Sequence, residues 1–261
     1  MIMGSSVFET WVDGRVPILK NYSQRLIDLS AEILTQLHTP NEDHLGVMSI
    51  CFLSKQFDHL NAIMLLGTHR DSELVARSML EGLAQFIWAV NGGQERARRW
   101  RDFGHIHNLR QLRNNPSLTT PDSVFKERVE NNVQAFGNTF YSKNALNSEK
   151  RGIMLPGDPF AIDWTCMSVK ELFGQVESDG TLYRYYMRFA EWHHWAFAGF
   201  ARALDITGSS INYKPKSKVS AAQALAAGFQ CLFQTCELVS QHFQLSFGPR
   251  LEDLKAEYLH G

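Results

Sequence analysis

Apolar residues recur at intervals of three and four positions along most of this chain, the spacing that places side chains on one face of an α-helix. In residues 17–38 the apolar stripe consists of Leu19, Tyr22, Leu26, Leu29, Ile33 and Leu37. A polar face lies opposite, as in an amphipathic helix. No stretch shows the alternation of apolar and polar residues that is typical of a half-buried β-strand. The pattern therefore predicts an all-α fold.

Residues that start and stop helices divide this pattern into segments. Pro17 suits the first turn of a helix. Residues 39–42 (Thr-Pro-Asn-Glu) are typical of a capping box, and Gly67 is expected to end the helix that follows. Residues 91–93 (Asn-Gly-Gly) are expected to separate two helices. Helices are predicted over residues 17–38, 40–66, 71–90, 94–112, 120–140, 168–173, 183–205 and 218–245, with a last short helix from Pro249.

Two stretches break the helical pattern. Residues 141–167 are rich in Asn, Ser, Lys, Gly and Pro, and residues 206–217 contain further glycine and proline. Long connections without regular structure are uncommon in compact domains. We expect residues 141–167 to be either a floppy connection or a lid over a site. The predicted architecture is one bundle-like domain over residues 1–261, with about seven or eight helices and one long loop.

Composition excludes several classes of protein. The formal net charge of −1 provides no global positive field that would attract nucleic acid. The four cysteines form no C-x-x-C pair, which favours free thiols in a reducing compartment. The first residues do not resemble a secretory signal, and no apolar run reaches the roughly 18 residues that a membrane span needs. We predict a cytoplasmic protein without membrane contact.

One segment of the chain is strongly basic. Residues 95–113 contain six arginines and two histidines, with Trp100 and Phe103 among them. Arginine combined with aromatic side chains suits phosphate contact and base stacking. The Arg96–Arg113 segment is therefore the predicted contact for RNA, and a solvated helix face is the alternative.

Residues 183–200 hold the strongest candidates for a site. His193 and His194 lie in a helical segment, on faces shared with aromatic and apolar residues, so both imidazoles are predicted to point inward. Arg188 precedes them on the same segment. Arg77 and Glu81 are four residues apart, which makes them neighbours on another helix. No metal-ligand, P-loop or dinucleotide motif stands in a suitable setting, so neither a metal nor a cofactor is predicted.

These residues resemble a known family. The early pair Arg77-x-x-x-Glu81 and the late segment Tyr185–His194 are similar to an uncharacterised, all-helical bacterial family of unknown function. Its pattern has R-x-x-x-E early and Y-x-x-x-x-S-x-x-x-H late. His194 matches the histidine, and Ala190 stands where that pattern has serine. The resemblance spans roughly residues 50–200.

The spacing from Arg188 to the two histidines also resembles the HEPN superfamily of helical bundles. Many HEPN proteins are metal-independent ribonucleases of toxin–antitoxin or antiviral systems, and two copies of their motif meet in a homodimer. Here Phe189 follows the arginine, where HEPN motifs usually have a polar residue. The resemblance implies a ribonuclease in which His193 or His194 transfers the proton and Arg188 stabilises charge on the phosphate.

In that interpretation Arg77 and Glu81 orient the imidazole. The alternative hypothesis is a non-catalytic helical module that binds a protein partner or a small ligand. Its pocket would be lined by Trp88, Trp192 and Trp195 together with the Arg77–Glu81 pair.

Overall fold

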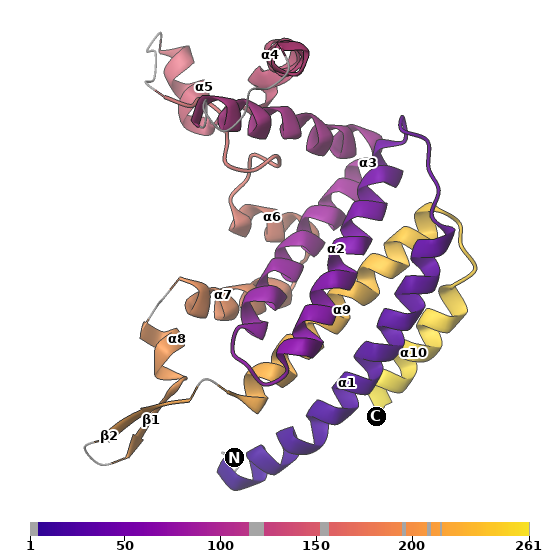
Figure 1. Cartoon of the computed structure of the whole chain (residues 1–261), viewed down its shortest axis with the longest axis vertical. Helices are drawn as coiled ribbons and strands as arrows, with labels where there is room; N and C mark the ends of the chain where they lie inside the picture. Colours follow the sequence, from indigo (N-terminus) through magenta and orange to yellow (C-terminus); the bar gives the residue numbers. More distant parts are fainter. Residues whose placement is uncertain are drawn as a thin grey trace.

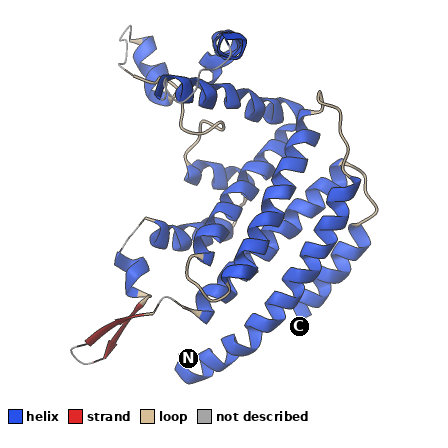
Figure 2. Cartoon of the chain, in the orientation of Figure 1, coloured by secondary structure: helices blue, strands red, loops and turns tan. Residues whose placement is uncertain are grey.

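The structure is a computed structural model, and it describes residues 5–114, 123–151, 157–194, 197–207, 210–214 and 216–260. Its α-helices are α1 (Ser5–Gln36), α2 (His44–Leu66), α3 (Ser72–Asn114), α4 (Ser123–Phe136), α5 (Lys143–Lys150), α6 (Val169–Val176), α7 (Thr181–His193), α8 (Phe197–Ala201), α9 (Lys218–His242) and α10 (Gly248–His260). The other elements described are a 3-10 helix, η1 (Gly137–Phe140), and a hairpin of β1 (Leu204–Thr207) and β2 (Ser210–Tyr213). The all-α prediction is confirmed (Figure 2).

Helices α1, α2, α9 and the first half of α3 form the main bundle (Figure 1). They bury one apolar cluster, whose fully buried members include Leu26, Ile33, Met48, Leu60, Met79, Leu83, Leu225 and Leu232. Burying each such side chain stabilises the fold by about 1.5–3 kcal/mol relative to exposing it. Helix α9 approaches α2 closely, because a Cβ atom on Gly228 would lie 3.0 Å from side-chain atoms of Leu60 and Ile63.

Helix α3 is kinked at Gly93. The predicted third and fourth helices are its two helical segments, which meet at Gly93, where the backbone is not helical. Gly93 has φ 62° and ψ −145°, a backbone conformation that glycine adopts without a Cβ clash. The break predicted at residues 91–93 is therefore confirmed, and it takes the form of a kink between the two segments. Beyond the kink, α3 leads to α4 and α5 at one end of the molecule (Figure 1).

The N-terminus of α2 differs from the predicted capping box. Its N-cap is Asp43, whose carboxylate accepts a hydrogen bond from the Gly46 N–H at 2.8 Å. Thr39 instead donates its hydroxyl to Asp43. The predicted end of α2 at Gly67 is confirmed. Pro17 lies inside α1, because that helix begins well before the predicted first turn.

Two other predicted helix ends were also wrong. The capping box of Ser168 and Glu171 is present, but α6 continues through Gly174 to Val176. The helix predicted over residues 183–205 ends much earlier, since α7 stops at His193 and a strand begins at Leu204. The hairpin formed by this strand occupies part of the predicted 206–217 loop.

The predicted loop at 141–167 contains a helix. Ser142 caps α5 by accepting a hydrogen bond from the Ala145 N–H at 3.1 Å. The later part of this stretch is packed against α3, where Trp164 is only 4% exposed and its ring lies 5.2 Å from that of Trp88. The described part is therefore not a floppy connection. Short helices such as α5 and α8 also explain why ten α-helices are described where seven or eight were predicted.

Candidate functional site

Helix α3 carries four polar residues at four-residue intervals: Glu73, Arg77, Glu81 and Gln85. We call them the polar row. Residues with this spacing share one face of a helix, and α7 packs against α3 (Figure 1). The contacts of the row are with α7, with residues 157–168 and with the segment that follows α8. Charged groups are thus placed at the boundary between the bundle and the helices beside it.

Arg77 lies at the centre of the row and is anchored by α7. Its Nη2 atom donates a hydrogen bond to the Tyr186 hydroxyl at 2.6 Å, and its guanidinium group lies 4.8 Å from the centre of the Tyr186 ring. The carboxylate of Glu81 is more distant, at 4.0 Å. Only 16% of the Arg77 side chain is exposed, and its Nε atom has no hydrogen-bond partner among the described residues. Tyr186 is therefore the principal anchor, and the sequence did not reveal this contact.

The surroundings of Arg77 shift the pKa values of Glu81 and Tyr186. Burial raises the pKa of Glu81, and the negative charge of Asp163 adds to that effect, while Arg77 opposes it. Burial also raises the pKa of Tyr186, with a further contribution from the charge of Glu81. Tyr186 therefore keeps its proton at neutral pH and remains a hydrogen-bond donor.

His193 and His194 are both exposed, so the prediction that they point inward is wrong. That prediction assumed a helix that continues past residue 194, but α7 ends at His193. The two imidazole rings have centroids 4.9 Å apart. Partial burial, together with the positive charge of Arg77 and the neighbouring His194, lowers the pKa of His193. An unprotonated His193 imidazole at neutral pH follows from this shift.

Arg188 is exposed on α7, and no hydrogen bond or ion pair in the described structure joins it to either histidine. Its carbonyl oxygen accepts a hydrogen bond from Arg202 at 3.1 Å. The structure therefore places Arg77 against α7 at Tyr186, and its charge acts on His193. Arg188 and His193 share α7, and His194 follows it directly, but no hydrogen bond joins Arg188 to them in the described structure.

The lower end of the polar row is a buried charge cluster that sequence reasoning missed. Glu73 is 1% exposed, and its carboxylate lies 3.5 Å from the guanidinium group of Arg202. Arg202 also approaches Glu191 at 3.6 Å. Arg70, which is 6% exposed, donates to the carbonyl oxygens of Arg202 and Lys214. These contacts tie the segment after α8 to α3. The repeat of polar residues every four positions was the signal that could have identified Glu73.

The upper end of the row is covered by Trp164. The indole N–H of Trp164 donates to Gln85 at 3.2 Å, and Gln85 donates to Asp163 at 3.1 Å. The ring of Trp88 is covered by Trp164 on one side, and the guanidinium group of Arg96 lies 4.2 Å from it. Trp88 is thus a packing residue.

The tryptophan pocket of the alternative hypothesis is accordingly not formed as predicted. Trp192 donates its indole N–H to Asp71 at 3.1 Å. Trp195 lies outside the described residues. Of the predicted lining, Glu81 alone borders a cavity considered below.

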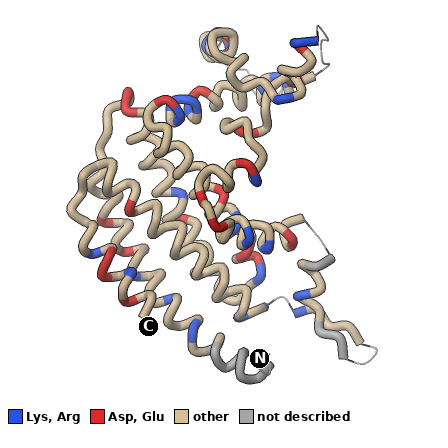
Figure 3. The backbone as a smooth tube through the Cα atoms, turned by 180° about the vertical axis from the view of Figure 1, so that it is seen from behind, with Lys and Arg blue, Asp and Glu red and all other residues tan. Residues whose placement is uncertain are grey.

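Most arginines in the basic segment of α3 form hydrogen bonds with the protein's own backbone. Four of its six arginines donate to backbone carbonyl oxygens: Arg96 to Trp88, Arg99 to Trp164 and Thr139, Arg101 to Asn41, and Arg110 to Phe160 and Ala161. Arg98 is 66% exposed but lies 3.6 Å from Asp102. Acidic and basic residues are interspersed along the backbone (Figure 3). RNA contact through Arg96–Arg113 stays a prediction.

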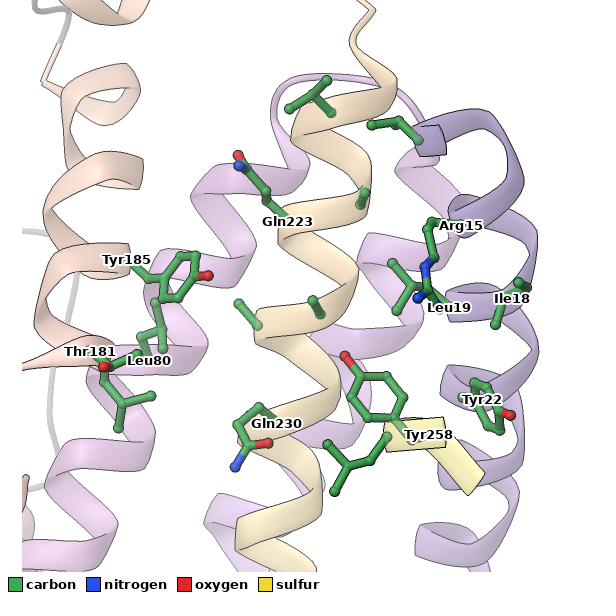
Figure 4. Close-up of a pocket in the computed structure, with 17 residues that line it drawn as sticks. Arg15, Ile18, Leu19, Tyr22, Leu80, Thr181, Tyr185, Gln223, Gln230 and Tyr258 are labelled. Atoms are coloured by element: carbon green, nitrogen blue, oxygen red, sulfur yellow. The ribbon is translucent and has the colours of Figure 1, made fainter. Parts of the chain in front are cut away.

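Two cavities flank this region. One of about 660 Å³ lies between α1, α7, α9 and α10, with a mostly apolar lining. Figure 4 shows Tyr185 of α7 and Tyr258 of α10 on either side of α9, with Gln223 and Gln230 between them. The other, of about 390 Å³, lies between α2 and α3 and has Glu81 in its wall. Of these two cavities, only the second is lined by members of the polar row, namely Glu81 and Gln85.

Two features are absent from the described ranges. No group of three or more His, Cys, Asp or Glu side chains there is arranged to hold a metal ion. No helix in the same ranges combines the length and the apolar character that crossing a bilayer requires.

Comparison with known proteins identifies a family. Neither the curated proteins nor the solved structures give a match. A family model described as a family of unknown function, DUF5677, matches residues 47–210. This range contains the polar row, Tyr186 and both histidines, and it spans more than half of the chain. The chain therefore belongs to the DUF5677 family of unknown function.

Proposed function

We propose that the histidine end of α7, together with Arg77, is an acid–base site that cleaves the phosphodiester backbone of RNA. One observation carries this proposal. Two exposed imidazoles have ring centroids 4.9 Å apart at the end of α7, and Tyr186 of the same helix anchors Arg77, whose charge acts on His193. These groups therefore share one electrostatic environment.

The chemistry needs a base, an acid and a positive charge. Unprotonated His193 takes the proton of a ribose 2′-hydroxyl, and the 2′-oxygen then attacks the adjacent phosphorus atom. His194 acts as the acid and gives a proton to the departing 5′-oxygen. The products are a 2′,3′-cyclic phosphate and a free 5′-hydroxyl, so atoms and protons balance. The internal nucleophile makes RNA, and not DNA, the substrate.

Arg77 stabilises the negative charge that develops on the phosphate. Its guanidinium group is preorganised by the Tyr186 hydroxyl and by Glu81, so little reorganisation is needed during the reaction. Exposed Arg188 on the same helix supplies a further charge for the backbone on either side of the cleaved bond.

Exposure of both imidazoles suits a polymeric substrate, which has to reach the site from solution. The net charge of −1 gives little long-range attraction, so we expect modest affinity that weakens as salt is raised. A second copy of the chain would present a second histidine pair, as the HEPN resemblance implies. Sedimentation of the purified protein would show whether a homodimer forms.

The test is cleavage of single-stranded RNA of mixed sequence by the purified chain, with analysis of the product ends. Wild-type protein should produce 2′,3′-cyclic phosphate ends, and the double variant His193→Ala/His194→Ala should not. His260→Ala removes another exposed histidine, on α10, and serves as the matched control. Equal melting temperatures would show that the variants fold.

Two results would overturn the proposal. One is cleavage by the double variant at the wild-type rate, which would place the activity elsewhere or in a contaminant. The other is the absence of cleavage by wild-type protein across RNAs of varied sequence and structure.

A further inference from the structure

The cavity of about 390 Å³ between α2 and α3 has the chemistry of a binding site for a flat polar ring. We call it the α2–α3 pocket. We propose that it binds a nucleobase, a planar heteroaromatic ring that donates N–H groups. The residues that carry this inference are Phe52, Gln56, His59, Ser78, Glu81 and Trp100, all of which line the pocket.

Aromatic side chains form one side of the pocket. The ring of Phe52 stacks on that of Phe86, with 5.4 Å between the ring centroids. It meets the ring of Trp100 edge-on, with 5.6 Å between the centroids. Trp100 is partly exposed and lines the pocket, so its surface is available to a ligand. Base–aromatic stacking contributes about 1–3 kcal/mol per base. Gly82 also lines the pocket, and an added Cβ there would lie 3.4 Å from Gln56 Nε2.

Gln56 provides an unused hydrogen-bond acceptor. The residue is 3% exposed, and its Nε2 atom donates to the carbonyl oxygen of Met79 at 2.9 Å. That bond fixes the orientation of the amide. The Oε1 atom is then left without a partner among the described residues. An unsatisfied buried acceptor costs about 1–3 kcal/mol, and a ligand N–H group would remove that cost.

The rest of the lining extends this pattern of acceptors and donors. Glu81 adds a carboxylate to the wall, and His59 Nε2 lies 3.4 Å from the Ser78 hydroxyl. Burial, and after it the charge of Lys55, lowers the pKa of His59, which favours the neutral imidazole. Exposed Lys55 places a positive charge at the rim. A base with N–H donors directed inward and a phosphate near Lys55 matches these groups.

Such a base could belong to a free nucleotide or to an RNA strand. Binding itself does not depend on the proposed ribonuclease activity. If that activity holds, Glu81 connects the two sites, because it lines the α2–α3 pocket and also contacts Arg77. The pocket would then hold a base near the cleaved bond and determine sequence preference. That last step rests on the proposed function.

The test measures binding of GMP, AMP, CMP, UMP and ribose 5-phosphate by calorimetry. Wild-type protein should bind at least one nucleotide, and ribose 5-phosphate, which lacks a base, should not bind. Cys51 also lines the pocket and is exposed, so a bound nucleotide should slow its alkylation by N-ethylmaleimide. Peptide mass spectrometry would locate the modified cysteine.

Gly82→Met fills the pocket and should weaken binding at least tenfold. Gly174→Met is the matched control, because the added Cβ on this exposed helical glycine of α6 would meet nothing within 4 Å. Gln56→Leu should also weaken binding if it folds. The His193→Ala/His194→Ala protein should bind as wild type does, which separates this inference from the ribonuclease proposal.

A 2′-deoxy oligonucleotide, which lacks the internal nucleophile, identifies the source of the base. Binding of free nucleotides that is lost in Gly82→Met supports a nucleotide site. Binding of the oligonucleotide alone, again lost in Gly82→Met, supports an RNA base. Failure of every probe to bind, or equal binding by wild type and Gly82→Met, would overturn the proposal.

Discussion

Asp43 accepts a hydrogen bond from Gln94 Nε2 at 2.6 Å, one residue beyond the kink in α3. The same carboxylate caps α2 through the Gly46 N–H at 2.8 Å. His242, the last residue of α9, lies 3.2 Å from its other oxygen. One side chain therefore joins the ends or bends of three helices.

This position predicts sensitivity to acid. Burial alone would raise the pKa of Asp43, but hydrogen bonds from Gln94, Gly46, Thr39 and His242 together lower it well below its usual range. Stability from a depressed carboxyl pKa is present above the unfolded-state value of about 3.9 and is lost as pH falls toward the folded value. Unfolding free energy measured from pH 5 to pH 2 should therefore fall more steeply for wild type than for Asp43→Asn.

Asp58→Asn, on the exposed side of α2, is the control for that comparison. Its stability curve should run parallel to that of wild type. A curve for Asp43→Asn that is also parallel would show that Asp43 contributes no acid sensitivity.

Removing Glu73 should destabilise the fold strongly. The carboxylate is 1% exposed, and its loss would leave Arg202 with the more exposed Glu191 as its remaining acidic partner. Breaking a buried ion pair from one side costs about 3–5 kcal/mol. Chemical denaturation of Glu73→Ala should show a loss of this size. Glu130→Ala, in an exposed pair with Lys126, should cost at most about 1 kcal/mol, and equal losses would contradict the prediction.

Replacing Arg77 should raise the pKa of His193. Burial is the first cause of the lowered value and would remain, whereas the repulsion from Arg77 would disappear in Arg77→Met. A titration of the imidazole by NMR would detect the change. Arg188→Met removes a charge from the same helix without removing a cause of that shift. The two variants should therefore differ, and identical titrations would show that Arg77 does not act on His193.

Gly93 and Gly104 offer a matched pair of substitutions within α3. Gly93 has a positive φ of 62°, so Gly93→Ala should destabilise the fold by about 1–3 kcal/mol. At Gly104 an added Cβ meets nothing within 4 Å, and alanine favours helix by about 0.5–1 kcal/mol over glycine. Thermal unfolding should shift in opposite directions for the two variants. A shift in the same direction would mean that the kink does not persist in solution.

Periodicity identified the long helices because each buries one continuous stripe. Glycine as a stop signal placed the end of α2 at Gly67 and the break in α3. Periodicity could not detect α5 and α8, since helices of eight and five residues span too few turns to show a period. The early end of α7 at His193 was also missed, and with it the exposure of both histidines.

The candidate site was found only in part for a related reason. Arg77 and Glu81 are neighbours within one helix, so their spacing is visible in the sequence. The contact of Arg77 with Tyr186 crosses from α3 to α7, and the packing of the two helices creates it. Gln56 likewise meets Met79 across the α2–α3 boundary. Such pairs depend on how helices pack, which local spacing does not encode.

The bend at Gly93 has a mechanical consequence. Residues before it belong to the bundle, whereas Arg99 and Arg110 beyond it hold the backbone of the segment that contains Asp163 and Trp164. Straightening α3 at Gly93 would move that segment away from Gln85. The bend at Gly93 thus helps to hold Trp164 over Gln85, at the upper end of the polar row.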